Sequence, residues 1–178
     1  MSNESASTGD ALVHLFDAAV RFISESPADA VVPPEGREGV YLGDGGGIAS
    51  GERLHGRLRF SFYSGNCLYP QIRRGMAVPD HLHLCTINPG GYIESDDGAR
   101  IAFDGNGYGL RSPERYRVSM TMAFRTDDAR YAWLTRVLGV MEGDFDEKTG
   151  RAVWHVYVPG SLSPRFEGID SVRTPRTE

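Results

Sequence analysis

An Asp-Gly pair at residues 97–98 is the feature of this sequence that most limits its fold. It lies between two runs of alternating residues, Gly91–Ser95 and Ala99–Asp104. Asp-Gly between alternating runs is typical of a β-hairpin, because a two-residue type I′ turn needs positive φ at both central residues. The sequence therefore predicts two antiparallel strands joined at this pair.

The register of this hairpin decides the chemistry that we expect from it. With Asp97 and Gly98 as the whole turn, Glu94 shares one face with Tyr92, Ile101 and Phe103. A carboxyl group among apolar side chains has a raised pKa and can act as a general acid or base near neutral pH. Glu94 is therefore the candidate acid if this face points inward. The structural alternative is an outward Glu94, solvated or paired with an arginine.

Other short runs along the chain predict a mainly β fold with about eight strands. A pattern of many short strands with little helix between them favours an antiparallel barrel or sandwich. We expect a single lipocalin-like antiparallel β-barrel, because a closed barrel of this size leaves no edge strand and can hold one small ligand. Besides the hairpin, the expected strands are Val40–Leu42, Glu52–Phe62, His81–Ile87, Tyr116–Thr126, Trp133–Val140 and Arg151–Val158.

The N-terminal region predicts a helix outside this barrel. Six apolar residues recur there at helical spacing, which indicates an amphipathic helix that must pack on the barrel or on a sister subunit. A homodimer or higher homo-oligomer would form through this helix. The six residues are Leu12, Leu15, Phe16, Ala19, Phe22 and Ile23. The expected division is an N-terminal extension at 1–30, a linker at 31–46, the barrel at 47–160 and a polar tail at 161–178.

Composition narrows the class of protein. The 178 residues have a formal net charge of −5, and the arginines are scattered along the sequence, so we expect no nucleic-acid partner. Two cysteines make no disulfide framework. The N-terminus has no basic start followed by an apolar run, and no stretch approaches the ~20 apolar residues of a membrane span. We expect a cytoplasmic protein with no membrane partner.

Four stretches resemble a known family. They are GIASGERLHGRL (Gly47–Leu58), YIESDDGARI (Tyr92–Ile101), RTDDARYAWLTR (Arg125–Arg136) and VWHVYV (Val153–Val158). The chain resembles the family catalogued as domain of unknown function 3237. This resemblance implies a lipocalin-like barrel, similar in shape to allene oxide cyclases, and no settled reaction. The run Cys85–Gly91 departs from the family pattern, which points to an altered pocket.

The candidate site follows from the hairpin and from the aromatic residues. We expect a cofactor-free acid–base enzyme of the isomerase, cyclase or lyase type that acts on a small hydrophobic carbonyl- or hydroxyl-bearing molecule. Glu94 would move the proton, and Tyr92, Tyr108 or Arg111 would stabilise the oxyanion. The alternatives are a non-catalytic carrier of such a molecule and a module whose barrel is filled by side chains. The expected substrate-binding residues are Phe103, Thr121, Phe124, Tyr131, Trp133 and Trp154.

Other motifs point away from cofactors and metals. The glycine-rich run Gly43–Gly51 has neither the spacing nor the lysine of a phosphate loop, so it predicts a glycine-rich strand or bulge. His81, His83 and Cys85 alternate on one strand face but extend over about 13 Å, so one metal ion rarely takes all three, and the alternative is a site of His81 and His83 with a distant third ligand. We therefore expect no cofactor and no metal site.

Overall fold

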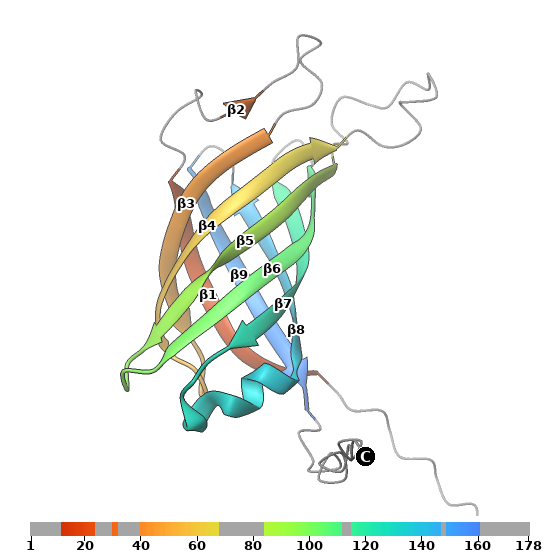
Figure 1. Ribbon diagram of the computed structural model, residues 1–178. Helices are drawn as coiled ribbons and strands as arrows, with labels where there is room; N and C mark the ends of the chain where they lie inside the picture. Colours follow the sequence, from red (N-terminus) through yellow and green to blue (C-terminus); the bar gives the residue numbers. More distant parts are fainter. Residues whose placement is uncertain are drawn as a thin grey trace, which may run out of the picture.

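The chain folds into a closed antiparallel β-barrel of eight strands (Figure 1). The computed structural model describes residues 12–23, 30–31, 40–67, 84–111, 115–146 and 149–160. A further two-residue strand, β2 (Ala30–Val31), pairs with β3 alone. The barrel strands are β1 (Leu12–Ile23), β3 (Val40–Ser50), β4 (Gly56–Cys67), β5 (Leu84–Ser95), β6 (Arg100–Arg111), β7 (Tyr116–Arg125), β8 (Leu138–Asp146) and β9 (Arg151–Pro159). The predicted barrel is confirmed.

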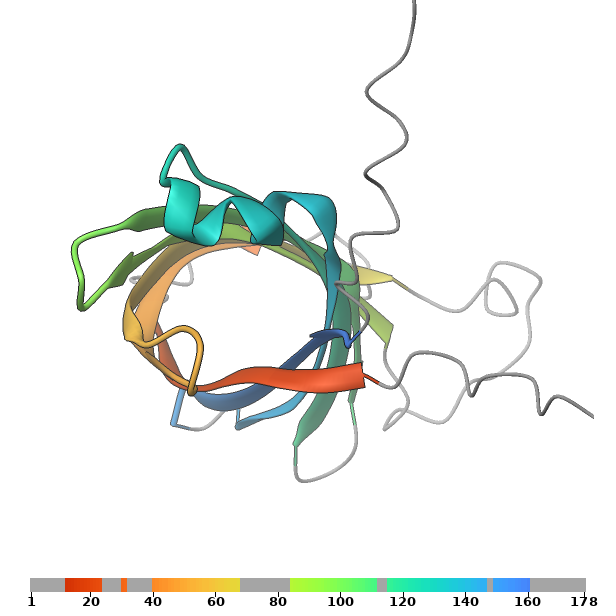
Figure 2. The same cartoon turned by 90° about the horizontal axis from the view of Figure 1, so that it is seen from below.

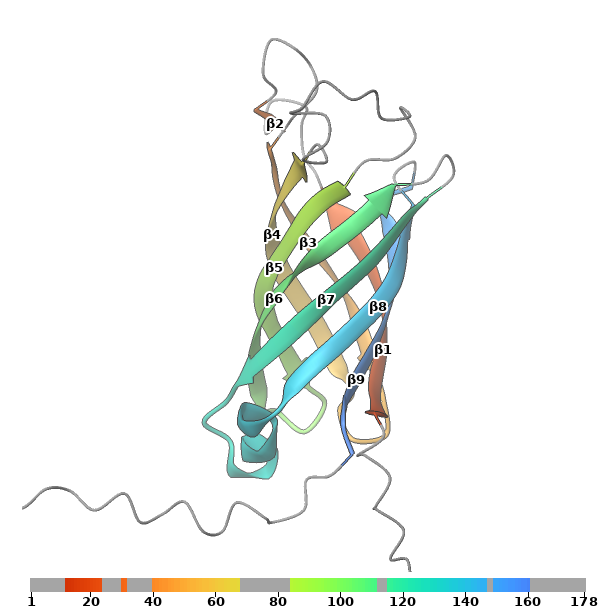
Figure 3. The same ribbon diagram turned by 90° about the vertical axis from the view of Figure 1, so that its right-hand side faces the viewer.

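The N-terminal segment is strand β1, so the prediction of an amphipathic helix is wrong. β1 pairs with β9 on one side and β3 on the other and closes the barrel (Figure 3). A β-bulge between His14 and Phe16 shifts the alternation by one residue, and both Leu15 and Phe16 are buried. This break in the period of two produced the apparent helical spacing. The barrel therefore begins at Leu12, and residues 40–46 of the predicted linker 31–46 belong to β3.

The hairpin between β5 and β6 is one residue longer than predicted. The Ser95 amide donates to the Ala99 carbonyl (2.9 Å), and the Gly98 amide donates to the Ser95 carbonyl (2.9 Å). The loop thus has three residues and ends at Gly98, whose φ is +87°, as in a type I turn with a G1 bulge. Since side chains alternate along a strand, the one-residue change moves Glu94 of β5 to the face opposite Ile101 and Phe103 of β6. Glu94 pairs with Arg100 and is exposed.

The alternation in β7 shows which face is inside. Five residues of β7 are buried and point into the barrel, while the residues between them face outward. The predicted alternation of this strand is confirmed, and the apolar side is the inner one. The buried residues are Tyr116, Val118, Met120, Met122 and Phe124.

The segment after β7 is a 3-10 helix, η3 (Ala129–Arg136), in place of the predicted strand start at Trp133. The Asp128 side chain accepts a hydrogen bond from the Arg130 amide (2.9 Å) and caps the helix. The helix lies at the lower end of the barrel beside the β5–β6 hairpin (Figures 1 and 2). Leu134 of η3 and Leu54 of the β3–β4 connection are both buried there, at 0% and 1% exposure.

Inward-facing glycines make room for large rings inside the barrel. A Cβ atom on Gly45 would overlap the Phe60 ring, and one on Gly43 would lie 2.8 Å from the Phe62 ring. The predicted glycine-rich strand is confirmed as β3. Its glycines allow two phenylalanines of β4 to lie flat against the wall of the barrel, which fills the interior with aromatic side chains.

Candidate ligand-binding site

Five aromatic side chains gather inside the barrel toward its upper end, where β1 ends and β9 begins. Phe22 is at their centre, with ring centroids 4.9 Å from Phe62, 5.0 Å from Phe145 and 5.1 Å from Phe60. Trp154 lies 5.0 Å from Phe60 and 6.3 Å from Phe22. Most of these contacts are edge-to-face, the arrangement that aromatic quadrupoles favour. We call this set the aromatic cup.

Among the residues that the structure describes, the aromatic side chains at the upper end of the barrel keep more solvent contact than the deeper ones. Phe22, Phe62 and Phe145 face inward and yet remain partly exposed, whereas the deeper Phe60 and Trp154 are 4% and 1% exposed. Inward-facing side chains that keep solvent contact mark the mouth of a barrel. A partly exposed apolar surface rich in aromatic rings is typical of small-molecule sites.

Trp154 carries a polar group that no described residue satisfies. Its indole Nε1 is buried and has no hydrogen-bond partner among the described residues. A buried donor without an acceptor costs about 1–3 kcal/mol. An oxygen atom from outside the described chain, either of a ligand or of water, would remove this cost.

The remaining described lining of the barrel is nearly apolar. Among inward-facing side chains that the structure describes, Ser95, Cys85, Tyr116 and Trp154 are the ones with a hydroxyl, thiol or N–H group. Tyr116 lies beside the cup, with its ring 5.9 Å from Phe145. Ser95 lies at the lower end and bonds to Asp97 and Ala99. The cup thus offers apolar surface with few polar groups.

Three of the predicted substrate-binding residues do lie inside the barrel. Phe103, Phe124 and Trp154 are 1%, 3% and 1% exposed. Phe103 and Phe124 are direct partners on β6 and β7 and belong to the packed core. Trp154 is therefore the predicted residue that lies within the cup.

The predicted catalytic residues are not brought together. Glu94 is exposed on the outer face, so the premise that it lies in an apolar pocket is wrong. Tyr92 is also on the outer face, where the Arg100 guanidinium covers its ring at 3.9 Å. Tyr108 is 55% exposed. The Arg111 side chain lies outside the described residues.

Three further predicted residues are also outside the cup. Thr121 faces outward and donates a hydrogen bond from its hydroxyl to the Asn106 carbonyl (3.3 Å). Tyr131 and Trp133 belong to η3, and the Arg53 guanidinium lies 3.8 Å from the Trp133 ring. Because η3 is at the lower end, these two aromatic side chains pack against the outside of the closed base.

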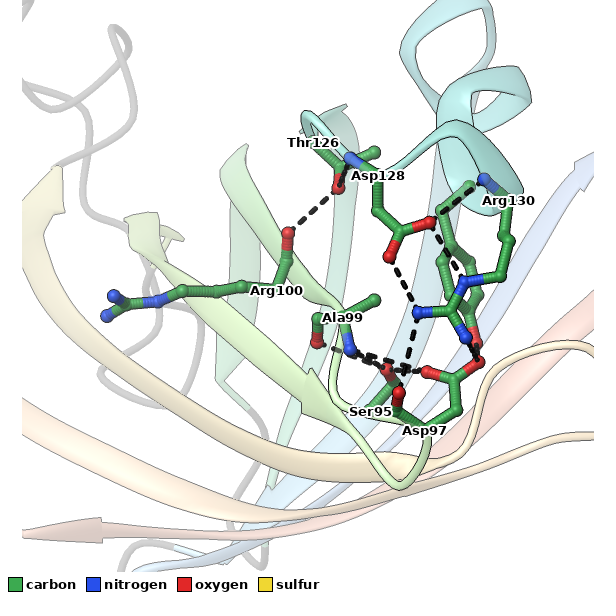
Figure 4. Close-up of polar contacts among 8 residues, drawn as sticks. Ser95, Asp97, Ala99, Arg100, Thr126, Asp128 and Arg130 are labelled. Carbon is green, nitrogen blue, oxygen red and sulfur yellow. Dashed lines mark hydrogen bonds and ion pairs between the residues drawn. The ribbon is translucent and has the colours of Figure 1, made fainter.

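A polar network ties the hairpin to η3 (Figure 4). Asp97 accepts hydrogen bonds from Ser95 and from the Tyr131 hydroxyl (2.9 Å), and it pairs with Arg130 (2.9 Å). Arg130 also pairs with Asp128 (2.7 Å), and its hydrogen bonds lower the pKa of Asp128 to about 2. The Ser95 bond, followed by that of Tyr131, lowers the pKa of Asp97. These carboxylates are held in their charged form by structural partners.

A second polar cluster lies on the outer face between β1 and β9. Asp17 Oδ1 is bonded to His14 Nε2 (2.8 Å) and to His155 Nδ1 (2.7 Å), and these bonds lower the pKa of Asp17. The bulge in β1 places His14 on the same face as Asp17. No three His, Cys, Asp or Glu side chains within the described ranges are arranged to hold a metal ion. The histidines His81 and His83 lie outside those ranges.

Sequence reasoning missed Phe22, Phe62 and Phe145. Phe22 was assigned to a helix, and Phe145 to none of the expected strands. A signal was present for Phe62 and for Phe145. Phe60 and Phe62 alternate with polar residues, and Phe145 lies between two aspartates. Reading these as inward positions of strands would have indicated an aromatic interior.

Comparisons with known proteins show the fold. No family model and no curated protein matches the chain. Solved structures do match, among them the following three. A β-barrel-like protein from Acinetobacter baumannii is 18% identical with a TM-score of 0.62, covering 87% of this chain and 99% of the other. A protein of unknown function from Rhodopseudomonas palustris is 16% identical with a TM-score of 0.64, covering 85% and 99%.

The third match is a protein of unknown function from Clostridium acetobutylicum. It is 16% identical with a TM-score of 0.60, and the match covers 84% of this chain and 99% of the other. Within the described residues, no helix is long and apolar enough to cross a membrane. At these identities the likeness establishes that the chain has the same β-barrel fold as these three proteins.

Proposed function

We propose that the protein binds a small apolar molecule bearing a carbonyl or hydroxyl oxygen in the aromatic cup. The observation that supports this most is the buried Trp154 Nε1, which has no acceptor among the described residues. Three partly exposed phenylalanine rings lie between Trp154 and the open end. The apolar rings would hold the body of the ligand, and the indole N–H would donate to its oxygen.

Entry of the ligand requires movement of Phe22. Trp154 is 1% exposed, and the Phe22 ring, 6.3 Å from it, contacts every other ring of the cup. A ligand ring that takes the place of Phe22 would keep the edge-to-face contacts with Phe60 and Phe62. Phe22 is partly exposed, so its ring can turn outward.

Binding without catalysis is the function that the described cup supports best. Its described lining supplies an N–H, a tyrosine hydroxyl and a thiol, but no carboxylate, imidazole or amine. The isomerase, cyclase or lyase predicted from the sequence stays a prediction that Glu94, on the outer face, does not support. Turnover of a bound carbonyl compound that Tyr116→Phe abolishes, with binding unchanged, would favour an enzyme over a carrier.

The test compares two ligands of the same shape. Acetophenone carries a carbonyl oxygen, and ethylbenzene has a methylene in its place. Wild-type protein should bind acetophenone about five-fold more tightly, which corresponds to a net hydrogen bond of about 1 kcal/mol. Trp154→Phe should remove that preference, because it keeps an aromatic ring and loses the N–H. NMR titration that follows the two indole N–H signals measures both effects.

The matched control is the other tryptophan of the chain. Trp133 lies in η3 at the lower end, so Trp133→Phe should leave the preference for acetophenone intact. A preference that survives Trp154→Phe would contradict the proposal. So would acetophenone binding that shifts the Trp133 signal and leaves that of Trp154 in place, which would mean that a water molecule satisfies Trp154.

A further inference from the structure

The outer wall of the barrel has two hollows that meet at Tyr92 on β5. The smaller, of about 280 Å³, is lined by Arg59, Ser61, Gly90, Gly91 and Tyr92 among others. The larger, of about 510 Å³, has Arg100, Arg125 and Asp127 in its lining. The inward-facing Gly45 and Phe60 also line the smaller hollow, whereas the larger one has no residue of the aromatic cup in its lining.

Glycine makes the floor of the smaller hollow. Gly90 faces outward, and a Cβ atom there would meet only the Asp104 carboxylate at 3.3 Å and the Phe103 carbonyl at 4.0 Å. The backbone of Gly90 and Gly91 is therefore bare on the outer side between Ser61 and Tyr92. Glycine inside a strand often marks a place where a ligand approaches the backbone closely.

Arg59 supplies positive charge beside this floor. It is the direct cross-strand partner of Tyr92, and it makes no ion pair with any residue in the described part of the chain. The other hollow is different. There Arg125 is paired with Asp104, Asp127 adds negative charge, and the Arg100 guanidinium already covers the Tyr92 ring. The smaller hollow thus has the arginine that is free to bind an anion.

Nearby carboxylates do not cancel the charge of Arg59. Asp44 lines the smaller hollow and accepts a hydrogen bond from the Ser61 hydroxyl (2.5 Å). Asp104 is bound to Arg125. Glu94 lies in register between Arg57 and Arg100. Among the described residues none of these acids forms an ion pair with Arg59, and the Ser61 hydroxyl that bonds to Asp44 is a neutral donor.

We propose that the smaller hollow binds a small planar anion, an aromatic carboxylate. Its carboxylate would lie on the Arg59 guanidinium, whose planar fork suits a bidentate pair. Its ring would lie on the bare Gly90–Gly91 backbone, against Tyr92. This site takes an anion on the outer wall, and it is independent of the neutral ligand that we propose for the cup.

NMR titration with 4-hydroxybenzoate and its neutral analogue 4-hydroxybenzamide tests the proposal. We expect 4-hydroxybenzoate to shift the Gly90 and Gly91 amides and to bind at least ten-fold more tightly than the amide. Arg59→Met should reduce the affinity at least ten-fold, and Tyr92→Leu about five-fold. The matched control is Arg57→Met, which removes an outward arginine of the same strand that lines neither hollow and should change the affinity less than two-fold.

Three results would overturn the proposal. One is equal binding of the benzoate and the benzamide. Another is an equal loss in Arg59→Met and Arg57→Met, which would mean that only overall charge matters. The third is a shift of the Trp154 indole signal without shifts at Gly90 and Gly91, which would place the anion in the cup. Both variants lie on the surface, and their amide spectra report directly whether they fold.

Discussion

At the lower end of the barrel polar side chains satisfy one another, whereas at the upper end an aromatic surface and a buried N–H have no complete set of partners. Asp97 and Arg130 each contact several groups in the network between the hairpin and η3. Phe22 and Phe145 at the upper end remain partly exposed, and Trp154 Nε1 is unpaired among the described residues. The comparison indicates that the lower end stabilises the fold, and the upper end is where we propose that a ligand binds.

The largest expected effect concerns the closed lower end. Leu134 of η3 is fully buried, so Leu134→Ala should lower the free energy of unfolding by about 2–5 kcal/mol. Leu138→Ala is the matched control, because Leu138 is 53% exposed and its loss should cost less than about 0.5 kcal/mol. Urea unfolding of both variants measures the difference. Equal losses of unfolding free energy in the two variants would show that Leu134 is not part of a packed core at the lower end.

At the upper end, the expected effect comes from adding volume. A methyl group on Gly45 would overlap the Phe60 ring, so Gly45→Ala should cost about 1–3 kcal/mol of stability by overpacking. Gly90→Ala is the control, since a methyl group there points outward and would meet only the movable Asp104 carboxylate, at 3.3 Å, and the Phe103 carbonyl, at 4.0 Å. Thermal unfolding compares the two. A Gly45→Ala variant as stable as Gly90→Ala would mean that the Phe60 ring moves freely and the cup is not formed as described.

The sequence was sufficient for the barrel but not for the placement of its candidate site. Alternation in Tyr116–Thr126 predicted β7 correctly, because one bulge-free strand with one buried face has an unambiguous period. The bulge at His14–Phe16 removed that period from β1. The turn at Asp97-Gly98 allowed two loop lengths, and hydrogen bonds of Ser95 with Ala99 and Gly98 selected the longer one.

This single-residue difference moved the predicted acid to the outside. Whether a hairpin loop has two or three residues depends on its contacts with the rest of the protein. In this hairpin Asp97 contacts Tyr131 of η3, which lies more than thirty residues later in the chain. The aromatic cup was equally hidden, because Phe22, Phe60 and Phe145 come from three separate parts of the chain. Only closure of the barrel brings them together.

A smaller effect is expected from the network between the hairpin and η3. Tyr131→Phe removes the hydroxyl that donates to Asp97 and should cost about 1 kcal/mol. Tyr108→Phe is the control, because the Tyr108 ring is 55% exposed on the outer wall. Amide exchange in η3 should increase in Tyr131→Phe alone. Equal amide exchange in the two variants would mean that the network does not stabilise the lower end.

The smallest effect is the response of the lower end to acid. The pKa values of Asp97 and Asp128 are lowered in the folded protein, that of Asp128 to about 2. Carboxylates with lowered pKa values stabilise the fold above their ordinary pKa of 3.8, and this contribution is lost as the pH falls through the folded value. Stability should therefore fall between about pH 4 and pH 2, and less steeply in Asp128→Asn. Near-ultraviolet circular dichroism of the η3 aromatic residues measures this loss of stability. The same dependence of stability on pH in Asp128→Asn and in the wild-type protein would contradict the prediction.

Intermolecular nuclear Overhauser effects from bound acetophenone test the difference between the two ends most directly. We expect contacts from the acetophenone methyl group to ring protons of Phe62, Phe145 and Trp154, and none to the methyl groups of Leu54 or Leu134. Contacts to Leu54 and Leu134, or only to outward residues such as Tyr108, would contradict the assignment of the upper end as the ligand site.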